Sequence, residues 1–522
     1  MHRLLPCVLA IVACSDDPAS VATTAPDSAD VSDAAGTPDA DAPDALDALD
    51  DLDEIDGIPT IADSDVSDTV DVDVAPPVAP VIYLTIAEIP PAMNGSQPSG
   101  ELTWRYRANR AHVSLDVVAT AGTLTSATIT CASDGVGLVV PAAEEITPTH
   151  WRVMIDEASA LPDGAAIDCA ADAAGPGGPA NHTSYAFDAA TLPPELDPFP
   201  TTDEWLVVLT RDIFDLVVTR DPGGTASFRS NHVAGGNGVI DFDEPFYELG
   251  LFSHAHPEAT ALVKAHLLSK VRQNIYTIYG LDPHGAPQPG SVDIRIWFEG
   301  DGGAPAPSDY GGARRFSKIA LGGDGDLADQ VATFGRALID WNNQDTEDDT
   351  VYGLGVFPTA LVRQVLALDV GALVLEPYRE ATGGVPFGDD PDDALFLGKD
   401  LLNSDMPDGS NAVARIDIYN LFVEFGALAL ASIVAHELGH SLGLVPSGLP
   451  PEGLFAGEDL DFVVSVAPDA HIDTEGLNVM QTGGSVNWLE AVTGDRPRFE
   501  PFSWAYLTRQ IVVGPVLDGG SL

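Results

Sequence analysis

The sequence is poor in positive charge: 23 Lys and Arg residues stand against 80 Asp and Glu residues, and the 522-residue chain has a formal net charge of −57. Nucleic acid is therefore excluded as a partner, because so acidic a surface has too few cations to neutralise phosphates. The shortage is most severe between Arg3 and Arg105, where no Lys or Arg occurs. Much of the excess charge thus belongs to a terminal segment and says little about a functional site.

Cysteine is also scarce, with four residues, and no Cys-x-x-Cys pair occurs. A thiolate zinc site or a thioredoxin-like redox motif is therefore unsupported. Cys7 and Cys14 lie near the start, whereas Cys131 and Cys169 lie in the body of the chain. In an oxidising compartment the latter two are candidates for one disulfide, and the alternative is a pair of buried free thiols.

Long hydrophobic runs are absent after the N-terminal segment. The nearest candidate spans residues 426–435, which is well short of the roughly 18 apolar residues that a membrane-spanning helix requires. We therefore expect the chain to contact a membrane only through its N-terminus.

The first 14 residues have the layout of an export signal, in which Arg3 precedes an apolar run over residues 4–13. Residues 11–14 (IVAC) resemble the lipobox of bacterial lipoproteins. This resemblance implies that Cys14 is acylated and becomes the mature N-terminus. We expect a lipid-anchored protein of the bacterial cell envelope, at the outer membrane or the cell surface; the alternative is a secreted protein with an ordinary signal peptide.

The remaining chain divides into three parts by composition. Residues 15–80 consist mainly of Asp, Ala, Pro, Ser, Thr and Val, and such an acidic, weakly hydrophobic segment predicts a disordered spacer. Residues 81–195 contain short β-branched and aromatic runs between turn residues, which favours an antiparallel β-sandwich. The predicted strands cover residues 81–85, 102–106, 113–117, 125–131, 151–155, 166–169 and 184–187.

The late strands of this second part resemble those of bacterial immunoglobulin-like repeats, on the evidence of residues 169–175 (CAADAAG) and 185–187 (YAF). The resemblance implies an immunoglobulin-like spacer or binding module. Residues 200–522 are mixed, and they predict a separate α+β domain. The expected strands there are residues 205–209 and 292–298, and the expected helices are residues 257–279, 329–342 and 357–368.

One segment of this last part carries a catalytic motif. Residues 427–444 are apolar and helix-compatible, and they contain His436, Glu437 and His440 in the order HELGH. Positions i and i+4 share one helix face, so both imidazoles can bind one zinc ion while Glu437 lies beside them. Zinc takes two neutral imidazoles and a third protein ligand, and it activates a water molecule from which Glu437 removes the proton. The alternatives are a surface helix with incidental charges and a metal-free relative of such an enzyme.

The segment resembles the metzincin zinc peptidases, whose motif is HExxHxxGxxH followed by a methionine turn. His436, Glu437, His440 and Gly443 match this motif, whereas Pro446 occupies the place of its last histidine. The resemblance implies a zincin fold and proteolysis, with the substrate extended along an edge strand, for which we consider residues 318–321.

Residues 477–483 (LNVMQTG) resemble the methionine turn. The resemblance implies that Met480 lies beneath the metal; the alternative is an ordinary core methionine.

The third zinc ligand must replace the histidine that Pro446 excludes. His471 is the only histidine that follows His440 in the sequence, and it lies shortly before Met480. One loop could therefore bring both side chains to the metal, and we predict that His471 is the third ligand. The alternatives are a surface position for His471 and ligation by a nearby carboxylate. These carboxylates are Glu452, Glu458, Asp459, Asp461, Asp473 and Glu475.

A weaker signal for Ca²⁺ lies in residues 233–244 (VAGGNGVIDFDE). Aligned with an EF-hand loop, this segment offers Asn237, Asp241 and Glu244 as ligands, but it lacks the first two carboxylates. The alternative is an Asn-Gly turn with a solvated acidic flank.

Together these features predict an exported, lipid-anchored zinc endopeptidase that acts on proteins or peptides. Two alternatives stay open. One is a catalytically inactive, zincin-fold lipoprotein for surface binding or adhesion, and the other is a zinc hydrolase for a non-peptide amide or a glycan.

Overall fold

The computed structural model describes only part of the chain. The described residues are 76–86, 103–106, 113–155, 165–191, 197–220, 226–325, 333–340, 343–367, 374–444, 478–481, 496–499, 501–508 and 512–514. Most of the predicted spacer lies outside the described residues, as do Cys14, Pro446 and His471.

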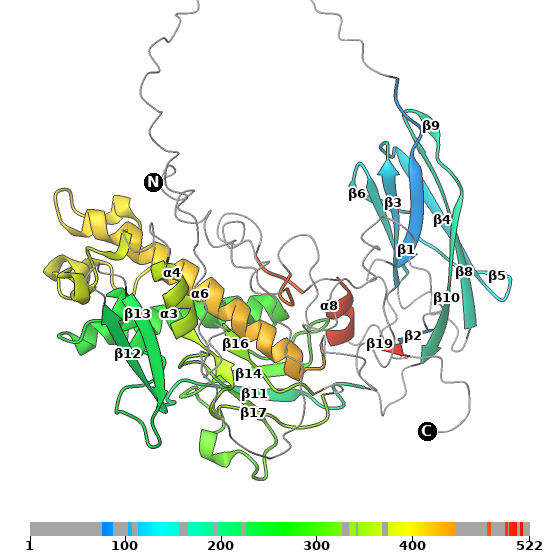
Figure 1. The fold of residues 1–522 in the computed structure, drawn as a ribbon. Coiled ribbons are helices and arrows are strands. Elements are labelled where there is room, and N and C mark those ends of the chain that lie inside the picture. Colours follow the sequence, from blue (N-terminus) through cyan, green and yellow to red (C-terminus); the bar gives the residue numbers. More distant parts are fainter. Residues whose placement is uncertain are drawn as a thin grey trace, which may run out of the picture. The chain divides into compact units, whose positions relative to one another are not determined.

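The described residues from 81 to 191 form strands and the turns between them, without a helix (Figure 1). One sheet has the order β1-β3-β7-β6, and the other has the order β19-β2-β10-β8-β4-β5 with β9 on β8. Strand bounds are β1 Val81–Ile86, β2 Thr103–Tyr106, β3 Val113–Ala121, β4 Ser126–Ser133, β5 Val136–Gly137, β6 Glu144–Thr147, β7 His150–Ile155, β8 Ala165–Gly175, β9 Gly178–Pro179, β10 Thr183–Thr191 and β19 Val512–Gly514.

All seven predicted strands of this part are present, but the expectation of purely antiparallel pairing is wrong. β2 pairs in parallel with β10, whereas β3, β4, β7 and β8 pair antiparallel with their neighbours. β1 and β2 belong to different sheets, so the chain crosses between sheets before it forms β2. A tight hairpin forces two successive strands to run antiparallel. β1 and β2 do not form a hairpin, so the direction of β2 is not fixed in this way.

A disulfide joins two neighbouring strands of the second sheet. Cys131 on β4 lies directly opposite Cys169 on β8, and both side chains are buried. Their sulfur atoms are bonded, and their Cα atoms are 4.1 Å apart. The bridge lies within one sheet, unlike the inter-sheet bridge of antibody domains.

We predict that neither Cys131 nor Cys169 is alkylated unless the protein is first reduced, as mass spectrometry of the two peptides will show. Replacing both residues by Ala should lower the free energy of unfolding by about 3–4 kcal/mol, because the bridge closes a loop of 38 residues. Alkylation of both thiols in unreduced protein would contradict the disulfide.

From residue 203 onward the described chain combines a parallel sheet with helices. The sheet has the order β14-β11-β15-β17, and each neighbouring pair is parallel. Its strands are β11 Asp203–Val208, β14 Ile294–Phe298, β15 Ser317–Ala320 and β17 Asp348–Asp349. Parallel strands need crossover connections, and the long helix α3 (Pro257–Tyr279) lies in the connection from β11 to β14. The continuous apolar run of β11 suits such a strand, since its side chains from Trp205 to Val208 are all buried.

Other elements surround this sheet. The helices are α2 Glu244–Leu249, α4 Pro358–Ala367, α6 Ala412–Ser441 and α8 Pro501–Leu507; the short 3-10 turns are η3 Pro307–Asp309, η4 Glu380–Thr382, η5 Pro391–Leu395 and η6 Asn403–Asp405. This part also contains two antiparallel ribbons. One pairs β12 Phe214–Arg220 with β13 Ala226–His232, and the other pairs β16 Gly335–Arg336 with β18 Gly355–Val356.

The predicted helix over residues 329–342 is wrong for the part that is described. Residues 333–340 contain β16 and otherwise no regular structure. Tertiary contacts outweigh local propensity here, because β16 pairs with β18 and comes too close to α6 for a side chain at Gly335. The suggestion that residues 318–321 form an edge strand is also wrong, since β15 lies between β11 and β17.

The apolar helix α6 is a core helix. By length and composition alone it could span a membrane, but 67% of its most apolar window is buried inside the protein. It packs along α3 (Figure 1), and this burial accounts for its apolar composition.

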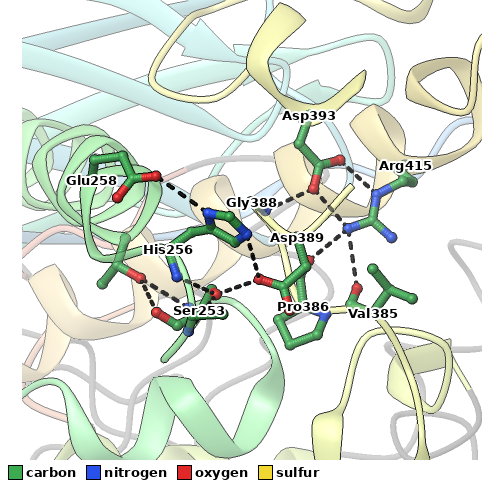
Figure 2. A network of polar contacts seen from close by, with 11 residues as sticks. Ser253, His256, Glu258, Val385, Pro386, Gly388, Asp389, Asp393 and Arg415 are labelled. Atoms are coloured by element: carbon green, nitrogen blue, oxygen red, sulfur yellow. Dashed lines mark hydrogen bonds and ion pairs between the residues drawn. The ribbon is translucent and has the colours of Figure 1, made fainter. Parts of the chain in front are cut away.

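A polar network anchors the first turns of α6 (Figure 2). Arg415 donates to both carboxylate oxygens of Asp393 at 2.6 and 2.9 Å and also to the carbonyl of Pro386 at 3.0 Å. In the same loop Asp389 accepts the hydroxyl hydrogen of Ser253, whose oxygen accepts the N–H of His256 just before α3. The network thus connects the N-terminal ends of α3 and α6.

Candidate active site

The last turns of α6 carry His436, Glu437 and His440. Glu437 and His440 are 5% and 8% exposed, whereas His436 is partly exposed. Helix α3 supports this end, because the hydroxyl of Tyr279 donates to the carbonyl of Ala435 at 2.9 Å. The motif therefore lies on a buried, braced helix and not on a surface helix.

The two imidazoles converge on one point. Their Nε2 atoms are 3.1 Å apart, and the ring planes are nearly perpendicular at 87°. Nδ1 of His436 lies 2.7 Å from the carbonyl oxygen of Val479, and Nδ1 of His440 lies 3.4 Å from that of Leu444. Carbonyl oxygens only accept hydrogen bonds, so these contacts favour the tautomer with the proton on Nδ1, in which each Nε2 is available to a metal ion.

This donor set fits a zinc ion. Two nitrogens that each bind a tetrahedral zinc at about 2.0–2.1 Å lie roughly 3.3 Å apart, close to the observed 3.1 Å. Facing lone pairs repel one another, and a shared cation turns that repulsion into attraction. Backbone carbonyls at the far ring nitrogens are the usual means of orienting histidine ligands.

Helix α6 ends immediately after the motif. Gly443 has φ of 91°, which strongly favours glycine, and it redirects the chain so that the carbonyl of Leu444 faces His440. The structure therefore gives Gly443 a conformational role at this helix end.

The segment predicted to form a methionine turn lies against the motif. Met480 is fully buried, and a Cβ added at Gly439 would lie 2.5 Å from its sulfur atom. The turn is held by the Asn478 side chain, which accepts the N–H of Met480 at 3.0 Å. Because Val479 orients His436, this turn both underlies the helix and positions one imidazole.

Strand β16 passes directly over Glu437. A Cβ added at Gly335 would lie 2.3 Å from Oε1 of Glu437, so only glycine fits there without rearrangement. The pKa of Glu437 is raised to about 8, mainly by burial and then by the negative charge of Asp349, while the positive charge of Arg336 lowers it. A cation bound beside Glu437 would also lower the pKa of this carboxyl group. The deprotonated carboxylate, which can act as a base, would then be favoured.

The buried side chain of Asp349 ties α6 to the segment after β16. One carboxylate oxygen accepts the N–H of Leu338 at 3.0 Å, and the other lies 3.2 Å from the hydroxyl oxygen of Ser441, next to His440. Ser441 also donates to the carbonyl of Leu338 at 2.8 Å. Burial is the main cause that raises the pKa of Asp349 to about 7. No sequence signal singled out Asp349, Gly335 or Arg336, because their roles depend on contacts with distant segments.

The third metal ligand is predicted among residues that the structure does not describe. Among the described residues no group of three or more His, Cys, Asp and Glu side chains could hold a metal ion. His471 and its carboxylate alternatives lie outside those residues, so the third ligand stays a prediction.

The structure also describes the segment considered for Ca²⁺. Asp241 accepts the N–H groups of Ile213 and Phe214 on one oxygen and the Nε–H of Arg211 on the other. Asn237 donates from its side-chain nitrogen to Glu244 at 2.6 Å. These contacts suit an Asn-Gly turn, and the calcium site stays a prediction.

A serine-type site is not formed by the network of Figure 2. The Ser253 hydroxyl donates to Asp389 and not to the imidazole of His256, whose Nε2 lies 4.0 Å from Asp389. Nucleophilic catalysis by serine requires a base within hydrogen-bond reach of the hydroxyl. These residues therefore serve to join the two helices.

The chain matches no protein-family model and no curated protein. Among solved structures it is similar to one titled "Anomalous substructure of Titin-A168169", with 13% identity, a TM-score of 0.13 and coverage of 26% of this chain and 73% of that chain. It is also similar to the chicken CNTN1 FN1-FN3 domains, with 16% identity, a TM-score of 0.13 and coverage of 26% and 51%. Likenesses of this size carry no argument about function.

We predict that Asp349→Asn keeps the fold and any activity, because an amide can still accept from Leu338 and can donate to Ser441. In wild type the raised pKa of Asp349 adds stability below about pH 4 that is lost as pH rises towards about 7. The asparagine variant should therefore gain roughly 2–3 kcal/mol relative to wild type between pH 5 and pH 7. Urea unfolding of metal-free protein at both pH values measures this.

Asp349→Ala is the contrasting variant. It leaves the N–H of Leu338 without its acceptor, so it should be less stable than the asparagine variant by about 1–3 kcal/mol at both pH values. Equal pH dependence in wild type and the asparagine variant would contradict the buried, proton-binding role of Asp349.

Proposed function

We propose that this protein is a zinc-dependent endopeptidase, with a metzincin-like zincin domain in residues 200–522 and an immunoglobulin-like sandwich in residues 81–195. The observation that carries the proposal is the convergence of the two Nε2 atoms of His436 and His440 beside the buried carboxyl group of Glu437. The buried Met480 beneath Gly439 supports it.

In this proposal the chain supplies orientation and proton transfer. A bound zinc ion would act as a Lewis acid that polarises the scissile carbonyl and makes water more acidic. His436, His440 and the predicted third ligand, His471, would hold it. Glu437 removes a proton from the attacking water and later delivers it to the leaving amine, which is general base and then general acid catalysis.

The substrate is proposed to lie along β16. The N–H of Phe357 donates to the carbonyl of Phe334, so the next pair, Gly335 and Val356, does not exchange hydrogen bonds. The N–H and C=O of Gly335 therefore point away from β18, towards the edge of the ribbon on which no described strand pairs. An extended peptide that pairs with them would pass beside Glu437, as strand addition to a sheet edge allows. Leu338 and Ile339, which are 46% and 38% exposed, offer it apolar contacts.

We further propose that the enzyme works in the bacterial cell envelope. The lipobox-like residues 11–14 motivate an acylated Cys14. The acidic spacer and the sandwich would then separate the catalytic domain from the lipid anchor.

We predict that Glu437→Gln retains about one zinc per chain but hydrolyses casein roughly 10²- to 10⁴-fold more slowly than wild type, because the amide cannot accept the proton. Metal analysis and a casein assay measure the two effects. Glu424→Gln, at an exposed position of the same helix, is the matched control and should behave as wild type. Unchanged hydrolysis in the Glu437 variant would refute the mechanism, and a metal-free wild type would favour a binding protein.

A separate prediction concerns the third ligand. His471→Ala should weaken zinc binding and hydrolysis by orders of magnitude, since a tetrahedral site then lacks one of its protein donors. Pro446→Ala, which removes no donor, should leave zinc content unchanged. Full zinc occupancy in the His471 variant would shift the search to the nearby carboxylates.

A further inference from the structure

Strand β16 carries an exposed cation one residue after Gly335, which lies against the proposed catalytic base. Arg336 follows Gly335 and is exposed, and it forms no hydrogen bond or ion pair with the described part of the chain. Its positive charge nevertheless acts on Glu437, whose Oε1 lies against Gly335. The guanidinium group is therefore near the proposed path of the substrate, and no described residue engages it.

The arrangement of β16 determines which substrate residue Arg336 would meet. Side chains alternate between the two faces of a strand. Gly335 turns its Cβ position towards Glu437, so Arg336 lies on the opposite face of the ribbon. A substrate residue directly across the open edge would place its side chain on the same face as Arg336, where oppositely charged pairs attract.

We infer that Arg336 is a specificity-determining residue that selects substrates with a carboxylate side chain, Asp or Glu, at the position facing it. This inference rests on the proposed peptidase function. Among the residues that the structure describes, the Arg336 side chain has no hydrogen-bond or ion-pair partner, so a substrate carboxylate would supply its counter-charge.

The test uses the full chain loaded with zinc and internally quenched peptides in which each position around the cleaved bond is in turn Glu, Gln or Lys. In wild type, one position should prefer Glu over Gln in kcat/KM by roughly 2- to 5-fold, as expected for a cross-strand ion pair. In Arg336→Gln this ratio should fall to about one. In Arg336→Glu the same position should prefer Lys.

Arg315→Gln is the matched control. Arg315 is also exposed, and its guanidinium group donates to the carbonyl of Gln344 at 2.8 Å. Its replacement should leave the Glu preference as in wild type.

The outcomes separate the two proposals. If wild type cleaves the peptides but shows no position with a Glu preference, or if Arg336→Gln retains that preference, the role of Arg336 is refuted while the peptidase function stands. If zinc-loaded wild type cleaves neither the peptides nor casein, both proposals fail.

Discussion

The cost of removing Glu437 and His440 from water is the constraint around which this part of the molecule is organised. Polar groups inside a protein must be compensated, and charged ones most of all. The carbonyl of Leu444 faces the His440 ring, and the carbonyl of Val479 faces the other imidazole. A metal ion at the facing ring nitrogens would complete this compensation. The motif on α6 is thus explained by the groups that surround it.

Two glycine residues allow β16 and Met480 to lie directly against α6. Gly335 brings β16 onto Glu437, and Gly439 admits the sulfur of Met480 next to the helix. Gly443 serves another purpose, because its left-handed backbone ends α6 and returns the chain to His440. Larger side chains at the first two positions would push apart segments that must touch for the site to exist.

Polar contacts support α6 near both of its ends. Arg415 and Asp393 anchor its first turns (Figure 2), and Tyr279 of α3 contacts its last turns. The proposed catalytic groups on this braced helix would be held in position before substrate arrives, which would lower the entropic cost of the proposed reaction. The connection from Ser441 through Asp349 to Leu338 extends this support to the proposed substrate strand.

The sequence by itself determined the features that depend on near neighbours. The helical spacing of His436 and His440, the helix at 257–279, the alternating strands and the cysteine pair all follow from local periodicity and residue type. Tertiary structure alone decided the parallel pairing of β2, the interior place of β15 and the replacement of a predicted helix by β16. Each of these depends on hydrogen bonds or close contacts between segments far apart in the chain, and local propensity does not encode such contacts.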